Sequence, residues 1–304
     1  MATSQIENMT VFSDTTSPRW SAYWELTKPR ISGMVLVSIV VSGIVAAGGQ
    51  PNIRSLIHVA IGMFLVAASG NAMNMYLERY TDLLMPRTAK RPLPDCRLSA
   101  LDVVTFAAIC LGSGLSYLLT TLNWPTAICA ALTWVLYVLV YTPLKSRTWL
   151  NTEVGAVAGA LPVLAGALAT TETPGWNAWG FFLVLLFWQF PHFMAIAWLY
   201  RDQYRDGGLQ MLTVVDPSGV RAGRKAVVMS IVTWLASLIP MFQMTSLAGA
   251  IIFGLLATIA AAFYFIASMQ FRSSTDESSA RRLLRVSVIY LPLYMLLIVV
   301  FSQF

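Results

Sequence analysis

Charged residues are scarce in this sequence. Only 11% of its 304 residues are Asp, Glu, Lys or Arg, whereas 57% are hydrophobic and the mean hydropathy is +0.66. Soluble globular domains carry about 25% charged residues, so the composition lies outside that class and indicates a protein of the lipid bilayer. A net charge of +6 would suggest nucleic acid in a soluble chain. Here the distribution of the charges matters more than their sum, and we expect no nucleic-acid partner.

Cysteines and targeting signals are equally sparse. The three cysteines, Cys96, Cys110 and Cys129, show no CxxC spacing and fall in or next to apolar segments, which favours neither a disulfide framework nor a zinc site. The first 30 residues lack the hydrophobic core of a signal peptide. They also lack the Arg-rich, acid-poor character of a transit peptide, since they contain Glu7, Asp14 and Glu25. A bacterial cytoplasmic (inner) membrane is therefore the simplest expected location.

Long apolar segments are what the sequence has in quantity. A transmembrane helix needs about 20 mostly apolar residues. Nine stretches meet this requirement, at 31–48, 55–77, 101–121, 125–142, 152–170, 177–199, 223–242, 246–269 and 284–303. None alternates with a period of two, so a helix bundle is expected and a barrel is not. We predict an all-α fold, with residues 1–30 as a cytoplasmic N-terminal tail and residues 31–304 as a single transmembrane domain of nine helices.

The basic residues lie almost entirely on one side of these segments. Nineteen of the 20 Lys and Arg fall in the N-terminal tail or in the loops after the second, fourth, sixth and eighth segments, and only Arg54 falls on the other face. The positive-inside rule then places the N-terminus and all long loops in the cytoplasm. An odd number of spans places the C-terminus outside.

The first concentration of acidic residues follows the second apolar segment. In NMYLERYTD, Asn74, Glu78 and Asp82 recur every four residues, which places them on one face of a helix. Carboxylates this close to the bilayer are costly unless they are paired or bound to metal, so they are functional candidates. Oxygen ligands of this kind suit Mg²⁺, which binds one or two carboxylates together with phosphate oxygens of a substrate.

A second acidic cluster lies at the same expected membrane face. RDQYRDGG repeats the spacing with Asp202 and Asp206 at the end of segment 177–199, before two glycines that can end the helix. The alternative is that the acids of both clusters only pair with the neighbouring Arg79, Arg201 and Arg205 as solvated charges.

Bases suited to phosphate follow both the second and the fourth apolar segments. Arg binds two phosphate oxygens at once through its planar fork, and Lys acts as a mobile point charge. The candidates are Arg87, Lys90 and Arg91, in the proline-rich stretch MPRTAKRPLP, and Lys145 and Arg147, in YTPLKSRT. Acids that bind metal, bases that bind phosphate and an apolar bundle beneath them together describe a site for a diphosphate with a long hydrocarbon tail.

Several of these stretches also match a known family. The matching motifs are LTKPRI from Leu26, N-x-x-x-E-x-x-x-D with its tail RTAKRPLP up to Pro94, YTPLK from Tyr141, NTEVGAVAGALPVLAG from Asn151, WQFPHF from Trp188 and DQYRDGG-ML from Asp202. On these motifs, which run over most of the chain, the sequence resembles the heme O synthase (protoheme IX farnesyltransferase) family of UbiA-type intramembrane prenyltransferases. The acidic motif alone marks only the superfamily. The combination of RTxxRPLP, YTPLK and WQxPHF points to heme as the acceptor.

The resemblance implies a reaction and its participants. The farnesyl group of farnesyl diphosphate would be transferred to a vinyl group of heme B, with water supplying a hydroxyl, to give heme O and diphosphate. Mg²⁺ is the implied cofactor, and a heme A synthase is a candidate protein partner. Two positions depart from the family pattern: Gln203 stands where an acid is usual, and Glu78 stands where many relatives have Asp. The first departure leaves open which of Asp202 and Asp206 meets a second metal ion.

The sequence thus gives a set of site assignments. Asn74, Glu78 and Asp82 are assigned to one Mg²⁺ ion, Asp202 and Asp206 to a second, and Arg87, Lys90, Arg91, Lys145 and Arg147 to the diphosphate. Metal ions and fixed cations would neutralise the charge that develops on the leaving diphosphate. His192, in WQFPHF, would ligate heme iron or act as a base, because neutral imidazole does both. The alternative is a histidine that is simply hydrogen-bonded.

Three other functions remain as alternatives at this point. A prenyltransferase of the same superfamily would act on a quinone precursor or a chlorin. A membrane transporter would carry charges near the middle of its helices, and its helices would be broken there. A non-catalytic assembly factor would have no need for metal ligands. The acids here gather at one end of the helices beside phosphate-suited bases, which favours the enzyme.

Overall fold

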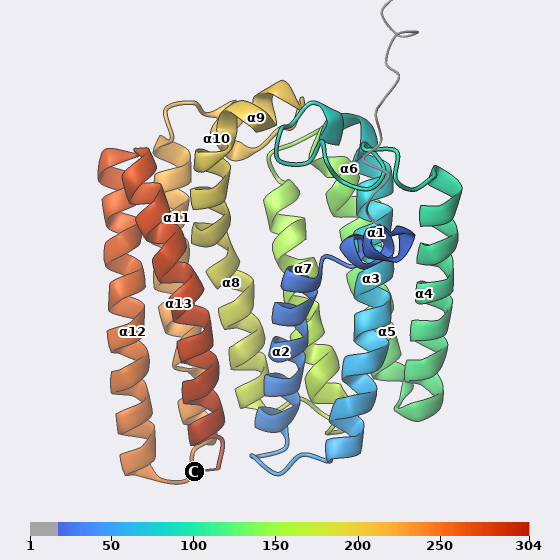
Figure 1. The fold of residues 1–304 in the computed structure, drawn as a ribbon. Helices are drawn as coiled ribbons and strands as arrows, with labels where there is room; N and C mark the ends of the chain where they lie inside the picture. Colours follow the sequence, from blue (N-terminus) through green and yellow to red (C-terminus); the bar gives the residue numbers. More distant parts are fainter. Residues whose placement is uncertain (1–17, 304) are drawn as a thin grey trace, which may run out of the picture.

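The helices expected from the apolar segments are present in the structure, a computed structural model that describes residues 18–303. That range contains helices and no strand, so the all-α prediction is confirmed. Nine helices among the described residues are long and apolar enough to cross a membrane, as predicted. Figure 1 shows them side by side in one bundle. Glu7 and Asp14 of the predicted tail lie outside the described residues.

The spanning helices follow the chain in order. They are α2 (Pro29–Ala46), α3 (Ile53–Leu83), α4 (Ala100–Thr121), α5 (Trp124–Val135) with the π-helix η1 (Leu136–Tyr141) and α6 (Thr142–Leu144), α7 (Asn151–Leu168), α8 (Trp176–Leu199), α11 (Val220–Ser237) with the 3-10 helix η2 (Ile239–Gln243), α12 (Leu247–Ser274) and α13 (Glu277–Phe301). Three short helices complete the fold: α1 (Arg19–Leu26), α9 (Arg201–Asp206) and α10 (Leu212–Val215).

Some helices extend beyond the apolar segments that predicted them. Helix α3 runs six residues past the predicted end at 77, and α13 begins seven residues before the predicted start at 284. At α13 the extension is stabilised by a capping box, in which the Asp276 side chain accepts a hydrogen bond from Ser279 N at 2.7 Å and Asp276 N donates to Ser279 Oγ at 3.3 Å. Hydropathy detects the part of a helix that lies in lipid, whereas caps and ion pairs decide where the helix ends.

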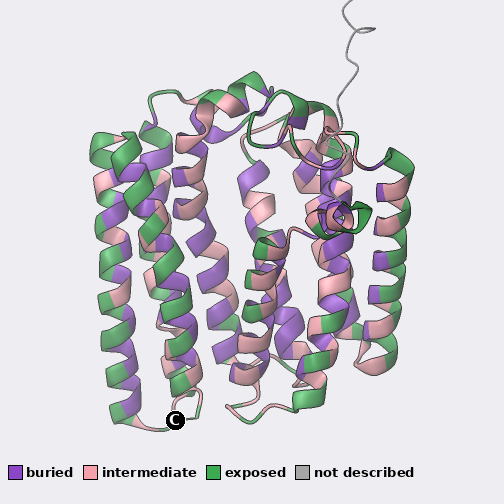
Figure 2. Cartoon of the chain, in the orientation of Figure 1, coloured by how far each residue is buried: buried purple, intermediate pink, exposed green. Residues whose placement is uncertain are grey.

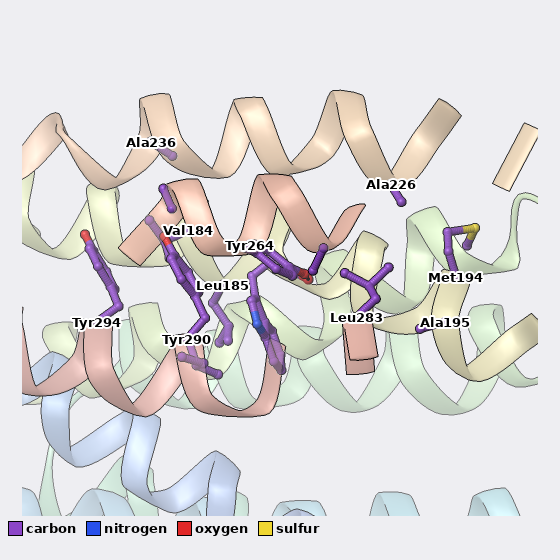
Figure 3. Packing of buried hydrophobic residues seen from close by; sticks show 14 of the residues in the cluster. Val184, Leu185, Met194, Ala195, Ala226, Ala236, Tyr264, Leu283, Tyr290 and Tyr294 are labelled. Carbon is purple, nitrogen blue, oxygen red and sulfur yellow. Dashed lines mark hydrogen bonds between the residues drawn. The ribbon is translucent and has the colours of Figure 1, made fainter. Parts of the chain in front are cut away.

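The largest hydrophobic core lies among α8, α11, α12 and α13 (Figure 3). Tyr290 stacks on Tyr264 and Tyr294, with ring centroids 5.1 and 6.2 Å away. The Trp188 indole donates to Ser287 O at 2.9 Å, and the Tyr264 hydroxyl donates to Trp188 O at 2.8 Å. These bonds satisfy polar groups that water cannot reach inside the bundle.

Helices α2 and α7 cross at very short distance. A methyl group built on Gly166 of α7 would lie 2.2 Å from the carbonyl oxygen of Ile39 on α2, so only glycine fits there. Beside this crossing, Ser42 Oγ donates to Val163 O at 2.6 Å. Small residues and interhelical hydrogen bonds of this kind hold helices together in lipid, where the hydrophobic effect does not drive helices to associate.

The loops that carry the candidate site lie at one end of the bundle. Figure 1 shows α6, α9 and α10 at this end and the end of α13 at the other. The residues of the predicted tail from Arg19 form α1, whose Ala22 and Leu26 are buried in a cluster with Ala72 and Met75 of α3. Figure 2 shows α7 and α8 mainly buried, whereas α4 and α12 at the edges expose their outer faces.

Candidate functional site

The end of α3 carries the first predicted cluster on one buried face. Asn74 is 1% exposed, Asp82 is fully buried, and the Glu78 side chain is 11% exposed. Each of the three binds a cation from a different segment. Lys28 Nζ donates to Asn74 Oδ1 at 2.7 Å, Lys145 Nζ to Glu78 Oε1 at 2.6 Å, and Arg91 Nη1 to the two Asp82 oxygens at 2.8 and 2.6 Å. Two carboxylates, one amide and three cations thus form a single buried polar site.

Lys28 is a site residue that the sequence analysis did not assign. It lies between α1 and α2 in the left-handed backbone region, at φ 47°, which a residue other than glycine rarely adopts. Asn71 of α3 holds this junction, since its Nδ2 donates to Thr27 O at 3.0 Å and to Ser32 Oγ at 3.1 Å. Burial and then the charge of Arg91 lower the pKa of Lys28 to about 7, against the influence of Glu78. The motif LTKPRI was the one signal that could have drawn attention to it.

The π-helix η1 shapes the wall of the site opposite Asn74. Thr142 Oγ1 donates to Tyr137 O at 2.8 Å and accepts from Asn74 Nδ2 at 3.1 Å. Pro143 follows and cannot donate a backbone hydrogen bond. Tyr141, whose ring stacks on that of Tyr137 at 5.8 Å, carries the Lys145 ammonium 4.6 Å from its ring centroid. Short π-helices often occur at functional sites, and this one orients the polar groups that surround α3.

The loop after α3 brings Arg91 back onto the acids. Thr88 Oγ1 donates to Asp82 O at 2.9 Å, which ties the loop to the helix end. Arg91 also lies 3.7 Å from Glu78 Oε2, so it bridges the two carboxylates. Burial opposes the charge of Lys145, yet the Glu78 carboxylate outweighs it and raises the pKa of Lys145. Lys145 is therefore held charged beside Glu78.

The second predicted cluster has a different environment. Asp202 and Asp206 lie on α9, a separate short helix, because α8 ends at Leu199. Their side chains are 63% and 65% exposed, and Arg205 lies 3.1 and 3.8 Å from them. Within residues 18–303 no three Asp, Glu, His or Cys side chains gather closely enough to hold a metal ion, so the structure does not join the two clusters. On α9 it is Gln203 that has a buried side-chain oxygen without a hydrogen-bond partner.

Contacts nevertheless place α9 beside the first cluster. Arg87 donates to the Tyr204 hydroxyl at 3.2 Å and lies 4.5 Å from the Tyr200 ring centroid. Gln210 N, after α9, donates to Lys145 O at 2.6 Å. Of the other predicted phosphate-binding bases, Lys90 and Arg147 are exposed, and neither side chain has a hydrogen bond or ion pair among the described residues.

Pairing between each acid and its sequence neighbours describes the second cluster but not the first. Arg79 packs on the rings of Tyr76 and Tyr80, each at 4.4 Å, and Arg201 packs on Trp198 at 4.3 Å. Neither forms an ion pair with Glu78, Asp82, Asp202 or Asp206 in residues 18–303. The partners of Glu78 and Asp82 come instead from Lys145 and Arg91, which lie in loops.

His192 is a residue of α8, and its ring contacts α13. Its Nδ1 is 2.8 Å from Ser287 Oγ, and its ring stacks on Trp188 at 4.8 Å.

Side chains of other segments occupy the space beside two glycines of α7. A methyl group at Gly155 would meet the Tyr141 ring at 2.7 Å, and one at Gly159 would meet Gln189 Oε1 at 2.3 Å. These glycines serve close packing.

The first cluster fits a magnesium ion in its donor chemistry. Glu78 and Asp82 supply two carboxylates and Asn74 an amide oxygen on one helix face, and Mg²⁺ takes such a set when phosphate oxygens of a substrate complete its coordination. The three cations around the acids suit the substrate phosphates that would accompany the ion. Asp202 and Asp206 lack this convergence and are solvent-exposed.

A nine-helix bundle with buried acids and phosphate-suited bases at one end defines an intramembrane prenyltransferase, and comparison with known proteins agrees. The model of the UbiA prenyltransferase family matches residues 35–289, and the chain belongs to that family. It is accordingly a prenyltransferase, and transporter and assembly-factor functions do not describe it.

Comparison with individual relatives shows which kind of prenyltransferase the chain is similar to. The chain is 40% identical over 283 residues to the protoheme IX farnesyltransferase of Rhodopirellula baltica, covering 90% of this chain and 96% of the relative. It is 36% identical to the enzyme of the same name from Solibacter usitatus, covering 89% and 95%. The resemblance to the protoheme IX farnesyltransferases is thereby confirmed.

Solved structures show the same fold. Digeranylgeranylglyceryl phosphate synthase aligns over 94% of this chain and 99% of its own, with a TM-score of 0.79 and 16% identity. A UbiA homolog from Archaeoglobus fulgidus bound to GPP and Mg²⁺ aligns over 91% and 99%, with a TM-score of 0.66 and 14% identity. At these identities the likeness concerns the fold alone.

Proposed function

We propose that this enzyme transfers the farnesyl group of farnesyl diphosphate to a vinyl group of heme B, with addition of water, to give heme O and diphosphate. The observation that carries the proposal is the buried site in which Lys28, Arg91 and Lys145 surround Asn74, Glu78 and Asp82. The names of the relatives at 36–40% identity support heme as the acceptor, in preference to a quinone precursor or a chlorin.

A magnesium ion at Asn74, Glu78 and Asp82 would supply Lewis-acid stabilisation of the leaving diphosphate. The chain's own cations would bind the same group, because Lys28, Arg91 and Lys145 already donate hydrogen bonds to the three side chains of α3 that would hold the ion. Arg87, Lys90 and Arg147 at the rim would add to the positive field that attracts the diphosphate.

The reaction requires the diphosphate to leave with the electrons of its carbon–oxygen bond. The terminal vinyl carbon then bonds to the farnesyl carbon, and water adds to the carbon next to the porphyrin and loses a proton. The rings of Tyr137 and Tyr141, stacked at the wall of the site, would stabilise allylic positive charge through their faces. Burial of the site limits quenching of that charge by bulk water.

Further assignments belong to the proposal. Asp202 and Asp206 would hold a second Mg²⁺ ion beside the first site, and α9 would have to move toward α3 for them to do so. His192 would face the acceptor as an iron ligand or base. The loops at this end would be cytoplasmic, with the C-terminus on the other side of a bacterial inner membrane, and a heme A synthase would receive the product.

The test is an assay with purified enzyme in detergent, containing farnesyl diphosphate, Mg²⁺ and either heme B or 4-hydroxybenzoate. We expect farnesylated heme, no prenylated benzoate, and loss of product on addition of EDTA. Asp82→Asn should lower kcat by about 100-fold or more, because it removes a charge that acts in the transition state. Asp95→Asn, which changes an acid of the loop after α3 that pairs with Arg97, is the matched control. Prenylated benzoate without farnesylated heme would contradict the proposal.

The proposed second metal site is tested with substitutions of its own two acids. Asp202→Asn and Asp206→Asn should each raise the Mg²⁺ concentration needed for half-maximal activity. If both variants titrate with Mg²⁺ as the unsubstituted enzyme does, α9 provides no metal ligand from these residues.

A further inference from the structure

A second group of cations lies at the same end of the bundle, on α11. Arg221 and Lys225 are four residues apart, so they share one helix face. Both lie over the ring of Trp149, with Arg221 Cζ 4.8 Å and Lys225 Nζ 5.5 Å from its centroid. Lys225 Nζ also lies 4.8 Å from the ring centroid of Phe190 on α8. The proposed reaction at the diphosphate assigns no role to these two cations or to the aromatic rings that they contact.

The charges of this group are only partly compensated. Lys225 is 14% exposed and forms an ion pair with Glu153 of α7. Arg221 is exposed and has no ion pair among the described residues, although its backbone N–H donates to Asp216. The second carboxylate oxygen of Glu153 is buried without a hydrogen-bond partner. Lys225 is thus paired with an acid through its side chain, whereas the Arg221 guanidinium is not, and Glu153 keeps an unused buried acceptor.

The short segment of residues 145–151 connects this group to the candidate active site. Its first residue, Lys145, binds Glu78, and its fifth, Trp149, lies beneath the two cations. Gln210 bonds to the segment at both ends, since its N donates to Lys145 O at 2.6 Å and its carbonyl accepts from Asn151 Nδ2 at 3.2 Å. The cations of α11 are thus fixed relative to those that surround α3.

We propose that Arg221, Lys225 and Trp149 form the site that holds the carboxylate edge of the tetrapyrrole acceptor. This inference rests on the proposed function. Heme B is a flat macrocycle with two propionate carboxylates on one edge, which matches two cations one helical turn apart beside an aromatic ring face. Farnesyl diphosphate has no carboxylate, and its charge is taken by Lys28, Arg91 and Lys145. The residues of α11 bind and orient the acceptor and do not take part in the chemistry.

The experiment compares the Michaelis constants for the two substrates in neutral detergent. Arg221→Gln and Lys225→Gln should each raise KM for heme B about tenfold, with KM for farnesyl diphosphate unchanged within twofold, because each removes one charge-assisted bond to a carboxylate. Arg224→Gln, an exposed arginine of the same helix outside the group, is the matched control and should leave both constants unchanged. Glu153→Gln should lower KM for heme B, since it removes a competing negative charge.

A second acceptor separates carboxylate binding from structural damage. With the dimethyl ester of heme B, the unsubstituted enzyme should show a raised KM, and Arg221→Gln should add no further increase. An equal increase for heme B and its ester would overturn the inference. A defect that appears only in phosphatidylglycerol vesicles, and not in detergent, would also overturn it and assign the group to a lipid headgroup.

Failure of the inference is distinguishable from failure of the proposed function. If the unsubstituted enzyme farnesylates heme B and the α11 variants match it, only the acceptor site is wrong. If the unsubstituted enzyme makes no farnesylated heme, the function itself is wrong and the acceptor site falls with it.

Discussion

Lys28 is the partly buried cation that joins the start of the membrane domain to Asn74 of α3. The spacing of Asn74, Glu78 and Asp82 predicted their shared face, because helix periodicity is a local property. It did not predict their partners, which come from segments 46, 67 and 9 residues away. Lys145 and Arg91 were assigned to the diphosphate from the sequence. Lys28 was counted only among the topogenic bases, since nothing local distinguishes it from Arg30.

We expect Lys28→Met to raise KM for farnesyl diphosphate about tenfold or more, because a buried charge-assisted contact to the substrate phosphates is lost. The KM for heme B should change little. Arg30→Gln, two residues away and exposed, is the control and should behave as the unsubstituted enzyme. A rise in both KM values, or a fall in kcat alone, would speak against diphosphate binding by Lys28.

The exposed acids of α9 show where residue types alone mislead. Asp202 and Asp206 repeat the spacing of the first cluster, yet a helix break after Leu199 places them on a short separate element beside Arg205. Hydropathy and spacing do not reveal this break. Whether these acids reach a metal ion depends on the position of α9, which is a tertiary property.

At the scale of helices, the nine spans could be predicted and their packing could not. A run of about 20 apolar residues is sufficient evidence for a span. The π-turn of Leu136–Tyr141, by contrast, leaves no periodic signature in an all-apolar segment. Tyr141, Gln189 and Ile39 occupy the space beside the glycines of α7, and these close contacts between helices could not be read from the sequence.

The crossing of α2 and α7 gives a prediction for stability. Gly166→Ala should destabilise the protein by about 1–3 kcal/mol, because the added methyl meets the backbone of Ile39, which cannot move aside as a side chain could. The measurement is the thermal unfolding midpoint in detergent. Gly112→Ala on α4, where nothing lies within 4 Å, is the matched control and should be neutral or slightly stabilising. Equal midpoints for the two variants would refute the close crossing.

For the whole molecule, the distribution of charge makes a prediction about orientation. The site end carries nearly all basic residues and should face the cytoplasm. In a variant without Cys96, Cys110 and Cys129, a single cysteine at Gln50 should react with an impermeant maleimide in intact cells. A cysteine at Ser218 should react only after the membrane is opened. The reverse pattern would invert the proposed topology.

The first and last spanning helices are neighbours, since α2 contacts α13 and Gly49 lies against Gln303. During synthesis the chain emerges from its N-terminus, so α2 enters the membrane long before α13, which covers part of its surface. The part of the chain from Lys28 to the end of α7 contains the three site cations Lys28, Arg91 and Lys145, and it can assemble early because α2 packs on α3 and α7. A chain that stops short of α13 would therefore expose the part of the α2 surface that α13 covers to the quality-control proteases of the membrane.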